Sequence, residues 1–378
     1  MKDKFHNSIL FVNQSSGYLM IDIINAFEDK YAERILLTGL LNARNNSLDK
    51  KVLVRKIIAY NRTSSFKRIL TWSIGFLQTL FLIKFKYRNA HLFLVSNPPF
   101  APLLPLFCNN QFTLLIYDVY PDALVEHKII KSYSWINKWW KKANRKLYAK
   151  ADKVFTISNG MKRLLTGYID GHKITVIPVW TDNNFLKPIP HEDNPFSLEH
   201  GLADKFIVMY SGNLGRSHDL EVVLELASQL EEDNITFLII GSGDKSKIIS
   251  EKIKDLHLKN IKLLPWQLTE TLPFSLASAD VAIVSLSKES SLLSVPSKTF
   301  NFMSVGVPIL AIAEKESELA VLIKEYQIGV SLTVDQKEEM IKFIKKNMID
   351  LEYHKSLKLK SLGTSKLFSP ENAKLFTT

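Results

Sequence analysis

Short apolar runs alternate with amphipathic helical patterns along almost the whole chain, and this alternation starts twice. The first series runs from Ile9–Asn13 to Ile174–Ile177, and the second from Phe206–Ser211 to Val330–Leu332. Strands separated by helices at this spacing predict a parallel sheet with helices on both faces. The sequence therefore predicts an α/β protein made of two doubly wound, Rossmann-like domains.

A polar segment that contains three prolines, residues 187–195, separates the two series and is typical of an interdomain linker. We place the first domain at 1–185 and the second at 186–365. Ligands of doubly wound sheets bind just beyond the carboxyl ends of the strands. The candidate functional residues are therefore those that directly follow a strand.

Cys108 is the single cysteine of the chain, so the sequence offers neither an intramolecular disulfide nor a multi-cysteine metal site. Residues 1–6 lack the features of a secretory signal. We expect a protein of the reducing cytoplasm.

Positive charge is concentrated in the first half of the chain. Residues 1–185 hold 27 Lys and Arg against 12 Asp and Glu, whereas residues 186–378 hold 22 against 26. Anionic lipid headgroups and nucleic acid are the two candidate partners for such a basic domain. No helix-turn-helix, zinc-finger or RNA-recognition signature is present, so we expect no nucleic acid partner.

Two helical segments of the basic half carry aromatic or apolar side chains beside the charges. The apolar stretch 69–83 has about 15 residues, short of the roughly 20 that span a bilayer, which predicts a buried or interfacial helix. A second helix near Trp135–Ala149 carries a basic stripe on one face, with tryptophans beside it: Lys138, Lys141, Lys142, Arg145 and Lys146 with Trp135, Trp139 and Trp140. We expect peripheral attachment to the inner face of the plasma membrane through 1–185; the competing interpretation is a core helix and a solvated face.

Glycine turns follow two strands of the second domain. One strand runs into Gly212-Asn213-Leu214-Gly215-Arg216 before a helix, and the next runs into Gly241-Ser242-Gly243. A glycine turn at a helix amino terminus presents backbone N–H groups to an anion. The chain lacks both the full G-x-G-x-x-G pattern and a G-x-x-x-x-G-K-S/T loop, so no motif supports a dehydrogenase or a kinase.

A lysine stands at the expected start of a helix in the segment that follows Ser294. Pro296 suits the entry to a helix, and Ser297 and Lys298 then fall in its first turn. A cation at this position opposes the helix dipole unless an anion binds there. The conflict indicates an anion site.

Taken together and in order, these segments resemble retaining glycosyltransferase family 4, which has the GT-B fold of two Rossmann-like domains facing across a cleft. They are Gly-Asn-Leu-Gly, Gly-Ser-Gly, Leu264-Pro-Trp and Val-Pro-Ser-Lys before Met-Ser-Val-Gly-Val-Pro. In the first half, Ser96-Asn-Pro-Pro-Phe and Tyr117-Asp-Val-Tyr-Pro-Asp122 resemble the branch that builds O-antigen and capsule. The closing Leu367-Phe-Ser-Pro-Glu-Asn resembles the last helix of the family, so we expect a helix at about 366–378 that returns to the first domain.

The resemblance implies a donor site for a nucleotide-diphosphate-sugar in the second domain. Arg216 and Lys298 would neutralise the leaving diphosphate as catalytic cations. The remaining donor-binding residues would be Gly212, Asn213, Gly215, Gly241, Gly243, Pro265, Trp266, Ser297 and Asn301. The family has two glutamates where this chain has Leu293 and Asn301; an amide at 301 could still bond a ribose hydroxyl.

The resemblance also implies an acceptor site in the first domain. Asp118 would orient or deprotonate an acceptor hydroxyl, or else be a turn aspartate. Ser16, Gly17, Asp122 and Glu126 are the other acceptor-binding candidates. We expect a lipid-linked saccharide acceptor, no cofactor and no metal ion, since no carboxylate pair with metal-ligand spacing is present. Two other functions stay open: a sugar-nucleotide 2-epimerase of similar fold, and a non-catalytic nucleotide-sugar-binding subunit.

Overall fold

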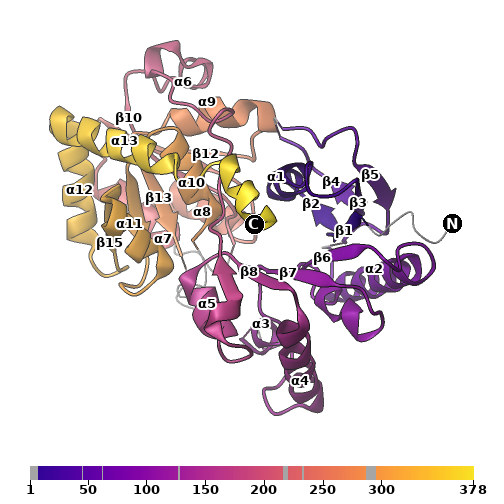
Figure 1. Ribbon diagram of the computed structural model, residues 1–378. Helices are drawn as coiled ribbons and strands as arrows, with labels where there is room; N and C mark the ends of the chain where they lie inside the picture. The colour runs from indigo at the N-terminus through magenta and orange to yellow at the C-terminus, as the bar shows by residue number, and fades with distance from the viewer. Residues whose placement is uncertain are drawn as a thin grey trace. The chain divides into compact units, whose positions relative to one another are not determined.

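The computed structural model describes residues 7–44, 46–61, 63–126, 128–215, 220–231, 234–286 and 295–378. The chain divides into two compact units. The first comprises Met1–Val179 together with Pro370–Thr378, and the second comprises Trp180–Ser369. In Figure 1 each unit is built around its own sheet, with helices packed against it. Both sheets are parallel, so the predicted α/β class is confirmed.

The described part of the first unit forms a seven-stranded parallel sheet in the order β5-β3-β1-β6-β7-β8-β9. Its strands are β1 Ser8–Val12, β3 Glu33–Thr38, β5 Leu53–Lys56, β6 His91–Val95, β7 Phe112–Ile116, β8 Lys153–Thr156 and β9 Ile174–Val176. A short parallel pair, β2 Ser15–Ser16 and β4 Leu40–Leu41, extends beyond the ends of β1 and β3. All of these strands point the same way, so their carboxyl ends lie along one edge of the sheet.

Helices cover both faces of this sheet (Figure 1). On one face, α1 Tyr18–Ala26 contacts the C-terminal 3₁₀ segment η5 Pro370–Thr377, whose Phe376 ring lies 4.9 Å from that of Phe155. On the other face, η1 Ala101–Leu106 contacts both α2 Ser65–Phe85 and α4 Trp135–Lys150. The smaller elements of this unit are α3 Asp122–Glu126, α5 Asn159–Leu165 and η2 Gly171–Lys173.

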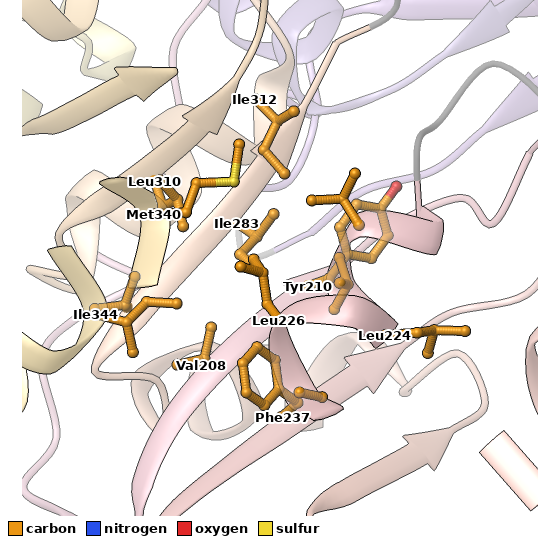
Figure 2. Close-up of a cluster of buried hydrophobic side chains, with 14 of the residues drawn as sticks. Val208, Tyr210, Leu224, Leu226, Phe237, Ile283, Leu310, Ile312, Met340 and Ile344 are labelled. Carbon is orange, nitrogen blue, oxygen red and sulfur yellow. The ribbon is translucent and has the colours of Figure 1, made fainter. Parts of the chain in front are cut away.

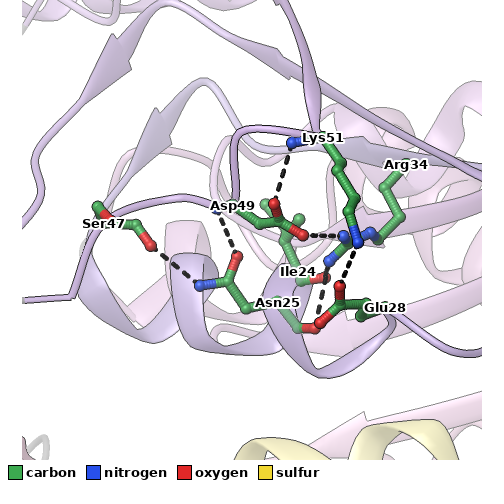
Figure 3. A network of polar contacts seen from close by, with 7 residues as sticks. All are labelled: Ile24, Asn25, Glu28, Arg34, Ser47, Asp49 and Lys51. Atoms are coloured by element: carbon green, nitrogen blue, oxygen red, sulfur yellow. Dashed lines mark hydrogen bonds and ion pairs between the residues drawn. The ribbon is translucent and has the colours of Figure 1, made fainter.

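A buried arginine in β3 ties α1 to the segment before β5. Arg34 donates from Nη1 to the carbonyl oxygens of Ile24, at 3.1 Å, and Asn25, at 3.2 Å. Its Nη2 donates to the carboxylate of Asp49 (Figure 3). The backbone N–H of Lys51 and the Arg34 guanidinium hold the pKa of Asp49 below its usual value. The bonds of Arg34 join β3 to α1 and to the segment before β5, the strand at the edge of the sheet.

The described part of the second unit forms a six-stranded parallel sheet in the order β12-β11-β10-β13-β14-β15. Its strands are β10 Phe206–Ser211, β11 Ile235–Ile240, β12 Ile261–Leu264, β13 Val281–Ser285, β14 Ile309–Ile312 and β15 Gly329–Leu332. Its helical elements are η3 His191–Asp193, α6 Pro195–Glu199, α7 Leu220–Gln229, α8 Ser246–Asp255, η4 Thr269–Thr271, α9 Leu272–Ala277, α10 Ser297–Ser304, α11 Glu318–Tyr326, α12 Lys337–Ile349 and α13 Leu351–Ser365. The strand order reverses between β10 and β13, which is where doubly wound sheets bind ligands.

A cluster of buried apolar side chains fills the space between this sheet and the helices α7 and α12. Figure 2 shows Val208, Phe237 and Ile283 from the strands facing Leu226 of α7 and Met340 of α12. Alternate residues of each strand point to this face, as the period of two in a strand requires. The apolar runs of the sequence are therefore continuous because these central strands are buried on both faces.

The structure differs from the sequence-based boundaries around the predicted linker. The units meet at Val179 and Trp180, and residues 187–195 belong to the second unit. There Asn194 caps α6 and donates from Nδ2 to the carbonyl oxygen of Phe274, at 2.8 Å. Pro190 and Pro195 therefore lie at the starts of short helices within the second unit. At the other end of the chain, α13 belongs to the second unit, and η5, which lies within the predicted helix 366–378, belongs to the first.

The packing of the second unit makes a prediction about its stability. Phe237→Ala should lower the free energy of unfolding by about 3–5 kcal/mol, because the ring is fully buried and its removal leaves a cavity. Leu359→Ala, on the exposed side of α13, should lower it by less than about 0.5 kcal/mol. Urea unfolding followed by circular dichroism measures both. Similar losses for the two variants would contradict the packing described here.

Candidate functional site

The glycine turn after β10 lies at the carboxyl edge of the second unit's sheet. Gly212 has a φ of 155°, a conformation that favours glycine, and its N–H donates to the carbonyl oxygen of Ile240 at 2.9 Å. The Tyr210 hydroxyl donates to the carbonyl oxygen of Asn213, at 2.9 Å, and so holds the turn from below. The turn is thus fixed by the strand that precedes it and by the neighbouring strand.

The second glycine turn packs directly against the first. A Cβ at Gly241 would lie 1.9 Å from the carbonyl oxygen of Gly212, and a Cβ at Gly243 would lie 2.6 Å from the backbone of Leu214. A Cβ at Gly215 would lie 2.8 Å from Nδ2 of Asn213. Gly241 and Gly243 are therefore needed for contact between the two turns, whereas a side chain at 215 would meet only Asn213 of its own turn. Contact between the turns is thus a second reason for glycine at 241 and 243, beside their predicted role in donor binding.

Lys298 reaches from the first turn of α10 to the glycine turn. Its Nζ lies 4.0 Å from the centroid of the Tyr210 ring, and a Cβ at Gly212 would lie 2.8 Å from the same Nζ. This nitrogen is buried and has no hydrogen-bond partner among the described residues. Pro296 precedes the helix and offers no side-chain cap to its first N–H groups. Two predicted anion-binding elements, the glycine turn and the helix start, therefore meet at Lys298.

The burial of Lys298 changes its acid–base chemistry. Removal from water disfavours the ammonium form and lowers the pKa of Lys298 to about 7. The face of the Tyr210 ring attracts the cation and offsets part of the cost. An anion beside Nζ would restore the charge, because an ion pair favours the protonated form. The arrangement suits a group that holds a negative charge near Gly212.

The second unit carries four further donor candidates. Asn301, one turn along α10, is buried, and its Oδ1 accepts a hydrogen bond from the Thr181 hydroxyl at 2.7 Å. Its amide nitrogen is then the group left to donate to a ligand. Trp266 follows β12 with 54% of its surface exposed, next to an exposed Pro265. Ser297 is exposed at the start of α10.

In the first unit, the Ser96 hydroxyl organises the loop that carries Asp118. Its Oγ accepts hydrogen bonds from the backbone N–H groups of Tyr117, at 2.9 Å, and Asp118, at 3.0 Å. Asp118 is exposed just past the end of β7, where a ligand of this sheet would bind. The sequence indicates Asp118 by its place after a strand, but it did not predict that Ser96 supports the Asp118 loop. The position of Ser96 just after the neighbouring strand is the signal that could have shown this.

The other acceptor candidates have structural partners. The Ser16 hydroxyl is buried and donates to the carbonyl oxygen of Asn13 at 3.2 Å. Asp122 accepts a hydrogen bond from the Tyr168 hydroxyl and pairs with Nζ of Lys141 at 2.7 Å. Their side chains are thus already engaged. Gly17 caps α1 and borders open space, and Glu126 is exposed at the end of α3.

Two predicted positions, Arg216 and Leu293, lie outside the described residues. Within the described ranges, no group of three or more His, Cys, Asp or Glu side chains is placed to hold a metal ion. Tyr210, whose ring lies beside the lysine, was not predicted as part of the site. Its position two residues before Gly212 is the signal that could have found it.

Comparison with known proteins identifies relatives of this chain. Residues 194–361 match the family described as Glycosyl transferases group 1. The chain is similar to the probable glycosyltransferase WbjE of Pseudomonas aeruginosa, with 30% identity over 232 residues, 60% of this chain and 57% of that protein. It is also similar to the putative colanic acid biosynthesis glycosyl transferase WcaI of Escherichia coli strain K12, with 27% identity, covering 49% and 46%. The chain thus matches about half the length of these relatives.

Solved structures share the fold. The crystal structure of Anabaena Alr3699/HepE in complex with UDP and glucose has a TM-score of 0.72 at 15% identity, covering 98% of both chains. WaaG, a glycosyltransferase involved in lipopolysaccharide biosynthesis, has a TM-score of 0.69 at 12% identity, covering 98% of this chain and 99% of that one. These likenesses confirm the predicted GT-B fold.

The buried lysine makes a prediction about stability and pH. Lys298→Met should raise the free energy of unfolding at pH 7 by about 1–3 kcal/mol, because it removes a desolvated cation. A lysine whose pKa is lowered on folding destabilises the folded protein most below the folded pKa, and this cost disappears as the pH rises towards the unfolded value. The stability gain of the variant should therefore shrink between pH 7 and pH 10. Thermal unfolding across this range measures it; a gain that does not depend on pH would contradict the assignment.

Proposed function

We propose that the chain is a group 1 glycosyl transferase, the family that residues 194–361 match, and that it moves a sugar from a nucleotide-diphosphate-sugar to a saccharide acceptor, with retention of configuration. Surface polysaccharide biosynthesis is the proposed context, supported by the similarity to WbjE and WcaI. The UDP complex of a protein with this fold supports a nucleotide-sugar as the donor. The sequence motifs that resemble family 4 agree with this proposal.

One observation carries the proposal: Nζ of Lys298 is buried beside the Gly212 turn and has no hydrogen-bond partner in the described part of the chain. In the proposed reaction, the bond between the anomeric carbon and the diphosphate oxygen breaks, and a bond to the acceptor oxygen forms. Negative charge grows on the leaving diphosphate, which accepts the proton of the acceptor hydroxyl on the same face of the sugar. Lys298 stabilises that charge where water is excluded. Asp118 is proposed to orient the acceptor hydroxyl.

The two rival functions make different chemical demands. A 2-epimerase abstracts a carbon-bound proton and needs carboxylates or histidines near the sugar, whereas the contacts of Lys298 with described residues include Tyr210 and Gly212. A binding subunit needs no group that responds to charge on a leaving diphosphate. Incubation with a nucleotide-sugar separates the three, since slow hydrolysis, epimer formation and binding without turnover are distinct outcomes.

We expect Lys298→Ala to reduce sugar transfer at least about a hundredfold, because one preorganised charge contact is worth that much in the transition state. Lys259→Ala, an exposed lysine of the same unit, should leave the rate unchanged. Release of nucleoside diphosphate from UDP- and GDP-sugars measures the rate, and circular dichroism verifies the fold. Unimpaired turnover by the Lys298 variant would exclude the lysine from the reaction.

We further propose that the acceptor is lipid-linked and that the first unit attaches to the inner face of the plasma membrane. The exposed face of α4 supports this: Trp135 is 75% exposed and Trp139 is 46% exposed, and Lys138, Lys142 and Lys146 follow each other at i, i+4 spacing. Two members of the predicted stripe do not contribute. Trp140 is buried against Phe100, and Lys141 pairs with Asp122.

Replacement of Lys138, Lys142 and Lys146 by glutamine should weaken binding to vesicles that contain phosphatidylglycerol. Each cation near an anionic surface contributes about 1 kcal/mol, and salt screens this contribution. The difference from wild type should therefore vanish at high salt. Co-sedimentation at low and high salt measures it. Equal binding of the variant and wild type at low salt would contradict attachment through α4.

A further inference from the structure

The outward side of α2 is an apolar surface without a partner among the described residues. Six large apolar side chains are 45–75% exposed there. They are Phe66, Ile69, Leu70, Leu77, Phe81 and Phe85. Their spacing by three, four or seven residues gathers most of them on one side of the helix. Contiguous apolar patches of this kind mark interaction sites.

The inward side of α2 is fixed to the first unit. Trp72, Thr79 and Ile83 are buried, and the Gln14 side chain donates to the carbonyl oxygen of Thr71 at 2.9 Å. Gln78 Oε1 accepts from the N–H of Ile58 at 2.8 Å. By length and composition the helix Phe66–Phe85 could cross a membrane. It is five residues longer than the apolar stretch 69–83 of the sequence analysis, and 28% of its most apolar part is buried. To span a bilayer the helix would have to leave the unit and break these contacts.

The charges around α2 select an anionic occupant. Residues 51–117 contain nine Lys and Arg and no Asp or Glu. Lys67 lies near the start of the helix, and Lys84, Lys86 and Arg88 lie at and beyond its end, all exposed. An apolar face with cations at both ends matches the boundary between headgroups and acyl chains.

The same side of the unit carries the basic face of α4. The segment η1 contacts both helices, and Phe76 of α2 lies 5.8 Å from Phe107, an exposed ring just after η1. The apolar surface of α2 therefore continues through Phe107 towards α4.

We propose that α2 lies along an anionic phospholipid bilayer with its outward side chains inserted among the acyl chains. This rests on the proposed membrane attachment and names the element that inserts. Lysines of α4 supply a salt-sensitive part of the binding, and α2 supplies a part that persists at high salt, since burial of apolar surface is not screened.

The test compares the full chain with the double variant Leu77→Gln/Phe81→Gln in binding to vesicles of phosphatidylcholine and phosphatidylglycerol at high salt. The variant should bind at least about tenfold more weakly. Leu359→Gln, whose leucine is as exposed as Leu77 but lies on α13 of the second unit, is the matched control and should bind like wild type. Thermal unfolding verifies that the variants are folded.

Equal binding of the double variant and wild type at high salt would overturn the proposal. It would also be overturned if the wild type formed a dimer without lipid and the double variant did not, since a second copy would then cover α2. Sedimentation velocity tests this. Hydrolysis of the nucleotide-sugar in vesicle-free solution should be the same for both proteins. If the wild type bound vesicles but did not hydrolyse the nucleotide-sugar, the proposed enzyme function would be rejected and the proposed membrane contact of α2 would be retained.

Discussion

The contact between the glycine turns after β10 and β11 governs the candidate site. The carbonyl oxygen of Gly212 lies where a Cβ of residue 241 would be, so the two turns can approach each other only if residue 241 is glycine. Lys298 then occupies the space above Gly212, where a side chain would likewise collide with its Nζ. The ends of two neighbouring strands and one helix start are thereby brought together. The result is a buried amine whose protonated form an anion would favour.

The sequence predicts the parts of this site that depend on local chemistry. A glycine after a strand and a lysine in the first turn of a helix are each visible in a short window, and both elements form where expected. The two doubly wound sheets follow from periodicity for the same reason. The unfavourable position of Lys298 in the first turn of a helix was informative, because no residue close in sequence offers its charge a partner.

What the sequence could not predict depends on residues that are distant along the chain. Thr181 engages Asn301 across 120 positions, and Lys141 pairs with Asp122 from another helix. No pattern of spacing encodes such pairs, so an engaged side chain resembles a free one. The segment 187–195, predicted as a linker, belongs to the second unit for a related reason. Prolines favour both linkers and helix starts, and the contact of Asn194 with Phe274 holds this segment in the second unit.

In the first unit, exposed apolar and basic side chains lie on the face of the sheet that carries α2 and α4. Each helix buries one side on the unit and leaves outward a side that is either apolar or basic. Exposed apolar side chains on a 21-residue helix are typical of an interaction surface. The proposed membrane attachment would explain both the charge asymmetry of the chain and the apolar face of α2.

We expect Lys298 to be largely neutral at pH 8 until the diphosphate of the proposed donor binds. Calorimetry of UDP or GDP binding at pH 8, in buffers of different ionisation enthalpy, counts the protons taken up on binding. Uptake of a large fraction of one proton is expected for the wild type, because the anion raises the pKa of Lys298 from about 7, and no uptake is expected for Lys298→Met. Binding without proton uptake, or equal uptake by the variant, would contradict it.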